Sequence, residues 1–165
     1  ADVIYHYGEE RFSRSIARAI VEAREIDPIL TTSQLVKIIH QNVRRSKDGI
    51  NPATRTFMAL RIQVNVELGE LERGLVRAEE ILAPGGRLAV VSFHSLEDRR
   101  GKRFFQDAAK GDPFPPDLPI RAKEISPVIL RPSRPQRPSD GEISDNPRAR
   151  SAILRWAQKS PSGQI

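Results

Sequence analysis

A short polar segment directly after a continuous apolar run is the first candidate for chemistry in this chain. Residues 88–91 predict a strand buried on both faces, and Ser92-Phe93-His94-Ser95 follows it. Open α/β sheets bind ligands at the carboxyl ends of their strands, so the imidazole of His94 and the hydroxyl of Ser95 are candidate site groups. The structural alternative is that Ser95 is a helix N-cap and His94 is a turn residue.

Arginines at helical spacing form a second candidate. Arg11, Arg14 and Arg18 lie three and four residues apart in a predicted helix over residues 8–26, which places them on one face. Such a face either binds phosphate or is simply solvated. Arg55 and Arg61 flank the start of a later predicted helix, where they can bridge parts of the chain or pair with a glutamate.

Arginine and proline alternate in a three-residue repeat near the carboxyl end. The repeat consists of Arg131-Pro132, Arg134-Pro135 and Arg137-Pro138. A polyproline II helix has three residues per turn, so the three guanidinium groups would lie along one edge and could follow a phosphate backbone. The alternative is an edge strand protected by proline, with the charges serving solubility.

The composition favours a polyanionic partner. The net charge is +6 and the pI is near 10.2, although such a surface also serves solubility alone. Aromatic residues make up only 5%, which argues against a stacking platform for single strands as the main binding device. The absence of cysteine excludes thiolate metal sites, suits a reducing cytosol, and leaves no metal site predicted. No apolar run approaches the roughly 20 residues that span a bilayer.

The apolar periodicity, helix caps and breakers predict the elements that position these residues. Thr31 and Gln34 have capping-box spacing, and Asn51 is an N-cap followed by proline. Residues 1–50 are expected to be helical, and the remainder to be α/β with a thin, three-stranded sheet. A long helix over residues 52–82, able to bend at Gly69 or Gly74, is expected to lead into the buried strand. The expected helices cover residues 8–26, 31–43, 52–82 and 95–110, and the expected strands cover residues 88–91, 127–131 and 151–157.

Four segments of the chain resemble a known family. They are Y-G-E-E-R-F from Tyr7 with I-A-R-A-I from Ile16, N-P-A-T-R-T-F from Asn51, L-A-P-G-G-R-L-A-V-V-S-F-H-S-L-E-D-R from Leu82, and N-P-R-A-R-S from Asn146. In this order and spacing they resemble the MraW family of ribosomal RNA small-subunit methyltransferases. The resemblance covers nearly the whole chain.

The resemblance implies a class I, Rossmann-like α/β methyltransferase. Residues 1–50 would be part of an all-helical substrate-recognition insert, and residues 51–165 the C-terminal part of the methyltransferase domain. The implied reaction transfers a methyl group from S-adenosylmethionine to the N4 of a cytidine in 16S ribosomal RNA. The implied partner is that RNA or the small ribosomal subunit, in the cytoplasm.

In a methyltransferase of this family, the turn after the strand would lie at the reaction site. The cytosine N4 amine is a poor nucleophile, so the site must align it with the donor sulfonium and let a proton leave. The resemblance implies His94 and Ser95 as candidate catalytic groups that hold the base. The expected RNA-binding residues are Arg11, Arg14, Arg18, Arg55, Arg61, Arg131, Arg134, Arg137, Arg148 and Arg150.

The chain departs from the family pattern at a few positions. Asn51 stands where histidine is usual and Met58 where glutamine is usual, while Arg100-Gly101 replaces two aliphatic residues and is expected to loosen its helix. The chain also has no glycine-rich turn leading from a strand into a helix, so we expect no donor-binding site and no activity from this chain alone. The alternative is a non-catalytic RNA-binding module derived from the family.

Overall fold

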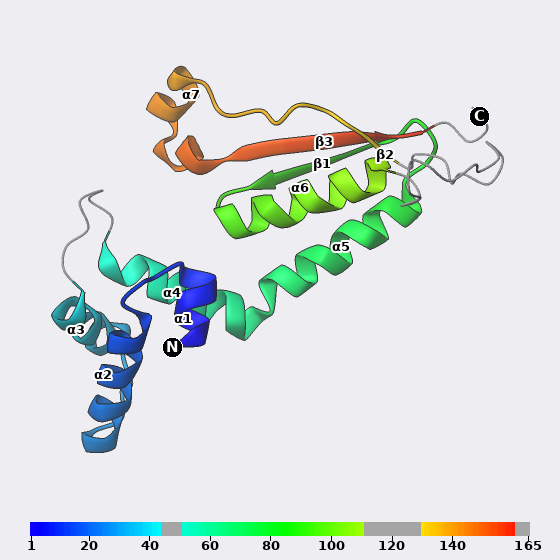
Figure 1. Ribbon diagram of the computed structural model, residues 1–165. Helices are drawn as coiled ribbons and strands as arrows, with labels where there is room; N and C mark the ends of the chain where they lie inside the picture. Colours follow the sequence, from blue (N-terminus) through cyan, green and yellow to red (C-terminus); the bar gives the residue numbers. More distant parts are fainter. Residues whose placement is uncertain (44–50, 111–129, 161–165) are drawn as a thin grey trace, which may run out of the picture. The chain divides into compact units, whose positions relative to one another are not determined.

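The computed structural model describes residues 1–43, 51–110 and 130–160, and the chain forms two compact units, Ala1–Glu67 and Leu68–Ile165 (Figure 1). The units divide at a later residue than the expected domains do, and the domain boundary at residue 50 stays a prediction. None of the described helices combines the length and the apolar character that crossing a bilayer requires.

The first unit is helical, as expected. Its core joins buried aliphatic side chains of all four helices, including Ile4, Ile16 and Ile39. Thr31 and Gln34 form the predicted capping box, and Asn51 accepts a hydrogen bond from the backbone N–H of Ala53 at 2.9 Å, as a predicted N-cap should. The helices are α1 (Asp2–Gly8), α2 (Ser13–Ile26), α3 (Thr32–Asn42) and α4 (Pro52–Asn65).

The prediction that one helix covers residues 8–26 was wrong at its start. Helix α1 ends at Gly8, Glu9 takes a left-handed conformation, and the carboxylate of Glu10 accepts a hydrogen bond from the backbone N–H of Phe12. A Cβ on Gly8 would lie 2.7 Å from the carbonyl oxygen of Arg55, so only glycine allows α1 to approach α4 this closely. The tertiary contact, not the local periodicity, therefore sets this chain reversal.

The expected long helix over residues 52–82 is also two helices. Helix α4 ends at Asn65, Val66 adopts a left-handed conformation with φ 53°, and α5 (Glu67–Ile81) follows. The break falls at neither predicted glycine. A β-branched residue strongly disfavours this conformation, and the apolar spacing continues on both sides, so the sequence pattern gave no sign of it.

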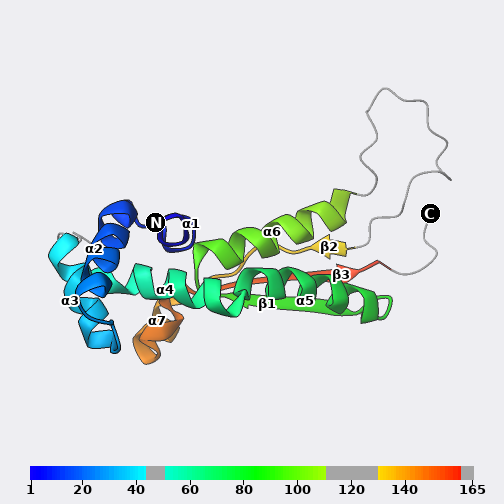
Figure 2. The ribbon, with the colours of Figure 1, turned by 90° about the horizontal axis from the view of Figure 1, so that it is seen from below.

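The second unit contains a three-stranded antiparallel sheet. Strand β3 (Ile153–Lys159) lies in the middle, between β1 (Arg87–Ser92) and β2 (Leu130–Pro132). Helices α5 and α6 (Ser95–Lys110) lie on the same side of the sheet (Figures 1 and 2), where Phe105, Leu130 and Ala157 form a buried core. The predicted strands at 127–131 and 151–157 correspond to β2 and β3, although residues 127–129 lie outside the described residues.

Strand β1 is covered on one face only within the described residues, which contradicts the expectation of a strand buried on both faces. Leu88 and Val90 are half-buried toward the helices, whereas Ala89 is exposed and Val91 is 55% exposed. In the same described parts of the chain, β1 pairs with β3 alone, so its other edge has no strand partner there. Residues 88–91 are apolar enough to be buried on both faces, but the described residues cover only one face of the strand.

The expected loosening of the helix at Arg100-Gly101 does not occur. Helix α6 runs unbroken from Ser95 to Lys110, and the guanidinium of Arg100 lies 2.9 Å from the Glu72 carboxylate of α5. The charged residue thus ties α6 to α5.

Replacing Gly101 with alanine should stabilise the chain. An added Cβ at Gly101 meets no atom within 4 Å outside its neighbours and its own helix backbone, so Gly101→Ala should raise the free energy of unfolding by about 1 kcal/mol. Gly74→Ala in α5 should do the same. Gly8→Ala should instead destabilise the helical unit by roughly 1–3 kcal/mol because of the clash with Arg55. Urea denaturation followed by circular dichroism measures all three, and a destabilising Gly101→Ala would contradict the packing described.

Candidate functional site

The turn between β1 and α6 is built around His94. The carbonyl oxygen of His94 accepts the first helical hydrogen bond of α6, from the backbone N–H of Asp98 at 3.1 Å. Its Nδ1 accepts from the backbone N–H of Glu97 at 3.4 Å, which satisfies a second amide of the first turn. His94 is therefore the N-cap, and the interpretation of Ser95 as the N-cap was wrong by one residue. Ser95 is the first helical residue.

Glu97 completes the cap from the other direction. One carboxylate oxygen accepts a hydrogen bond from the backbone N–H of Phe93 at 3.0 Å, and the other lies 3.1 Å from Nε2 of His94. The contact at Nε2 is close, but its direction is not that of a hydrogen bond. Because Nδ1 acts as an acceptor, the neutral ring carries its proton on Nε2. Both ring nitrogens of His94 thus face Glu97.

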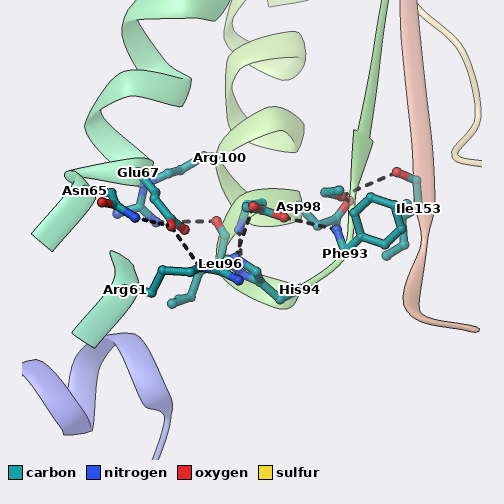
Figure 3. A network of polar contacts seen from close by, with 11 residues as sticks. Arg61, Asn65, Glu67, Phe93, His94, Leu96, Asp98, Arg100 and Ile153 are labelled. Atoms are coloured by element: carbon teal, nitrogen blue, oxygen red, sulfur yellow. Dashed lines mark hydrogen bonds and ion pairs between the residues drawn. The ribbon is translucent and has the colours of Figure 1, made fainter. Parts of the chain in front are cut away.

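An ion pair anchors this turn to the sheet. Arg155 of β3 donates two hydrogen bonds to the Asp98 carboxylate, at 2.7 and 3.0 Å, and both side chains are less than one-fifth exposed. The buried hydroxyl of Ser92 lies 3.5 Å from the same carboxylate and 3.4 Å from the carbonyl oxygen of Ile153 (Figure 3). The end of β1, the start of β3 and the first turn of α6 are therefore held by one polar cluster.

The electrostatics of this cluster favour an ionised Asp98. The hydrogen bonds donated by Arg155 lower the pKa of the Asp98 carboxyl, and this effect outweighs the opposing effect of burial. The charge of Arg155, the hydroxyl of Ser92 and the charge of Arg137 lower the same pKa further. Asp98 is thus a fixed negative charge among basic groups.

Phe93 is the large apolar residue of the turn, and its side chain remains exposed. Its backbone is held by Glu97, yet its side chain is 55% exposed. Figure 3 shows the ring on the side of β3 near Ile153, whereas the His94 ring lies at the start of α6. The turn therefore presents an aromatic surface instead of a free imidazole.

Arg148 and Arg150 lie at the same end of the sheet as the turn. They belong to the 3-10 helix η2 (Pro147–Ser151), which directly precedes β3 and follows the short helix α7 (Asp140–Asp145), and Figure 1 shows these helices at the end to which β1 points. Local contacts explain the residue types of the N-P-R-A-R-S motif. Asn146 caps η2 by accepting from the backbone N–H of Arg148, Ala149 is buried, and both arginines are exposed.

The arginine–proline repeat lies along β3. The backbone N–H of Ser133 donates to the carbonyl oxygen of Trp156 at 2.9 Å, and Gln136 exchanges two hydrogen bonds with Leu154 at 2.8 and 2.9 Å. The segment after β2 is therefore an interrupted edge strand along β3. This corresponds to the edge-strand alternative. Arg131, Arg134 and Arg137 are exposed, and a polyproline II edge that binds phosphate stays a prediction.

In the helical unit, the three arginines do not share a helix. Arg14 and Arg18 are exposed on α2, one turn apart, but Arg11 precedes the helix, and its guanidinium lies 5.2 Å from the centre of the Phe12 ring. The predicted single helical face was wrong for Arg11, because the chain reverses direction after Gly8. RNA contact by these three residues stays a prediction.

Arg55 and Arg61 both have glutamate partners. Arg55 lies 3.8 Å from the buried carboxylate of Glu10, and Arg61 donates to Glu67 at 2.8 Å. These pairs correspond to the structural alternative named for both residues. Contact of either one with RNA stays a prediction.

The sequence interpretation missed the residues that organise the turn. Glu97 and Asp98 were visible as two acidic residues in a first helical turn, a signal for a cap. Their partner assignments were not, because Arg155 is 57 residues from Asp98. Phe93 lies in the same segment, and the sequence alone indicates no role for it. Its exposure becomes evident only when the burial of the strand before it is known.

Removing the negative charge of Asp98 should destabilise the second unit in a pH-dependent way. A carboxyl with a lowered pKa stabilises the fold above its ordinary value near 4, and this contribution is lost as the pH falls through the lowered value. Asp98→Asn should therefore cost about 1.5–3 kcal/mol at pH 7, and the cost should decrease as the pH is lowered to 3 and below. Urea denaturation at both pH values measures it. The control Asp107→Asn, exposed on the same helix, should cost less than about 0.5 kcal/mol, and equal losses would contradict this assignment.

Comparison with known proteins identifies the relatives of this chain. The MraW methylase family matches residues 1–160. Proteins named ribosomal RNA small subunit methyltransferase H are similar: the one from Dechloromonas aromatica (strain RCB) is 50% identical over 159 residues, 96% of this chain and 52% of the relative. Those from Marinomonas sp. (strain MWYL1) and Rhodospirillum centenum (strain ATCC 51521 / SW) are both 54% identical, over 96% and 97% of this chain and 51% and 49% of the relatives. The chain thus spans about half the length of these curated relatives, and it belongs to the MraW methylase family.

Proposed function

We propose that this chain is part of an enzyme that transfers a methyl group from S-adenosylmethionine to the N4 of a cytidine in 16S ribosomal RNA. The observation that carries the proposal is the close relationship to proteins named as methyltransferases of small-subunit ribosomal RNA. The second unit agrees with it, because a polar turn at the carboxyl end of β1 lies at the same end of the sheet as exposed arginines. In the parallel α/β sheet that we propose for the complete protein, ligands would bind at the carboxyl end of β1.

The chemistry of the reaction explains what the turn has to provide. The lone pair of the cytosine N4 amine is delocalised into the ring, so the amine must be held in line with the methyl group of the sulfonium. A bond from N4 to carbon forms, the bond from sulfur to carbon breaks, and an N4 proton is released to solvent or to a nearby base. A rigid turn that fixes the base serves the first requirement.

His94 and Ser95 remain our proposed site residues, and the geometry supports a positioning role for His94. Both of its ring nitrogens face Glu97, so the imidazole shapes the turn instead of pointing a free acceptor away from it. Ser95 follows as the first residue of α6. We propose that these two residues define the backbone path against which the base is held.

The methyl donor is proposed to bind mainly outside this chain. In the described residues, β1 leads into α6 through Ser92-Phe93-His94-Ser95, a turn without glycine. A donor or dinucleotide cradle needs a glycine turn between a strand and a helix, because a side chain there blocks the close approach of the ligand. The same observation favours the second candidate function, an RNA-binding module without catalysis.

Donor binding and methyl transfer separate the two functions. Isothermal titration of the purified chain with S-adenosylmethionine should give no saturable heat at micromolar concentrations, whereas the complete protein should bind the donor. The complete protein should also transfer labelled methyl groups to small ribosomal subunits and yield N4-methylcytidine on nucleoside analysis. Donor binding by this chain alone would place the donor site here. Absence of transfer by the complete protein would favour the binding module.

Neutralising the arginines of η2 should weaken RNA binding without regard to sequence. Arg148→Gln with Arg150→Gln should lower the slope of log affinity against log salt by about 1 to 2, since two phosphate contacts would be lost. The control is Arg73→Gln with Arg77→Gln on α5, exposed residues of the same unit that pair with Glu70 and Glu80. Filter binding of ribosomal RNA to the complete protein measures both. Equal slopes for the two double variants would assign the η2 arginines to a solvated surface.

A further inference from the structure

Phe93 is a large apolar ring presented by a rigid turn. Its backbone N–H is bound by the Glu97 carboxylate at 3.0 Å, and the preceding Ser92 is buried within the cluster formed with Asp98. His94, the next residue, is held by the backbone N–H groups of Glu97 and Asp98, so the backbone is fixed on both sides of a side chain that is 55% exposed. Tyr5 is the other aromatic residue with this exposure in the described part of the chain, but its ring already contacts the ring of His6. An exposed ring on a fixed backbone is a surface prepared for a contact.

The surroundings of Phe93 are basic. Ser92 pairs with Ile153, so Phe93 lies at the level where η2 joins β3, and η2 carries the exposed Arg148 and Arg150. Arg137 lies close enough to the turn for its charge to act on Asp98. An aromatic face next to guanidinium groups is the combination that single-stranded nucleic acids use, since bases stack on the ring and phosphates bind the cations.

We propose that Phe93 stacks on one face of the cytosine that is methylated and holds this base, turned out of the RNA, in the site. The inference rests on the proposed function and adds the residue that recognises the target base. One ring is enough, because a single base is held, so the low aromatic content of the chain is no obstacle. Enzymes that modify a base extrude it and read it by stacking and by hydrogen bonds to its edge.

Stacking on one face also suits the geometry of the reaction. The lone pair of N4 lies perpendicular to the base while it is delocalised, so the donor methyl group must approach one face of the cytosine. A ring on the opposite face leaves that approach open and resists displacement of the base away from the donor. Phe93 needs no polar atom for this task, which agrees with its position between the capped His94 and the buried Ser92.

The test is a double-mutant cycle between the ring and the base in the complete enzyme. An RNA that the wild-type enzyme methylates is synthesised with either cytidine or an abasic ribose at the modified position. Phe93→Leu should weaken binding of the cytidine RNA by about 5- to 150-fold and binding of the abasic RNA by less than about twofold. Phe93→Tyr, which keeps an aromatic face, should restore affinity and kcat/KM. Val91→Ala, at a similarly exposed residue of β1, should affect both RNAs equally.

Several outcomes would overturn the proposal. If Phe93→Leu weakens binding of both RNAs equally and lowers the melting temperature, the ring packs against another part of the complete protein instead of the base. If the variant leaves the affinity for the cytidine RNA unchanged, the ring does not contact the base. If the wild-type enzyme methylates no RNA, the proposed function fails as well. The proposal alone fails when the wild type methylates RNA but no coupling between Phe93 and the base is measured.

Discussion

The bidentate ion pair between Asp98 and Arg155 is the interaction on which the rest of the candidate site depends. It joins the first turn of α6 to the central strand β3, with donor–acceptor distances of 2.7 and 3.0 Å in a largely buried setting. Planar guanidinium and carboxylate groups paired in this way fix direction as well as distance. Because Ser92 joins the same carboxylate, the end of β1 cannot shift without breaking the cluster. The turn that follows β1 therefore begins from a fixed point.

The two acidic residues at the start of α6 stabilise the turn through different partners. Asp98 faces the sheet and satisfies Arg155, whereas Glu97 faces back along the chain and satisfies the amide of Phe93. His94 supplies the remaining acceptor as the N-cap. Negative charge is also favourable at this position because the helix dipole is positive at its amino end. A motif that resembles a catalytic signature thus performs a structural task first, and what it exposes is an aromatic ring.

The basic groups of the second unit are distributed by simple local rules. In η2 the buried Ala149 faces the protein, and Arg148 and Arg150 on either side of it are exposed. In the segment after β2, Ser133 and Gln136 make the backbone hydrogen bonds to β3, and the nearby Arg134 and Arg137 remain exposed. Positive charge is thereby spread along β3 to the end that η2 precedes, without burial of any of these side chains. For a protein related to ribosomal RNA methyltransferases, this arrangement agrees with phosphate contacts that position the substrate.

The sequence by itself determined the features that depend on neighbouring residues. The cap at Thr31, the start of α4 at Asn51 and the order of strand and helix around the turn follow from spacing and side-chain type, and the motifs gave the family. The tertiary structure decided the break at Val66, the single covered face of β1 and the pairing of Asp98. Local periodicity reports which residues of one element share a face, but it contains no information on which distant segment covers that face or supplies a counter-charge. A partner 57 residues away, such as Arg155, is specified only once the chain has folded.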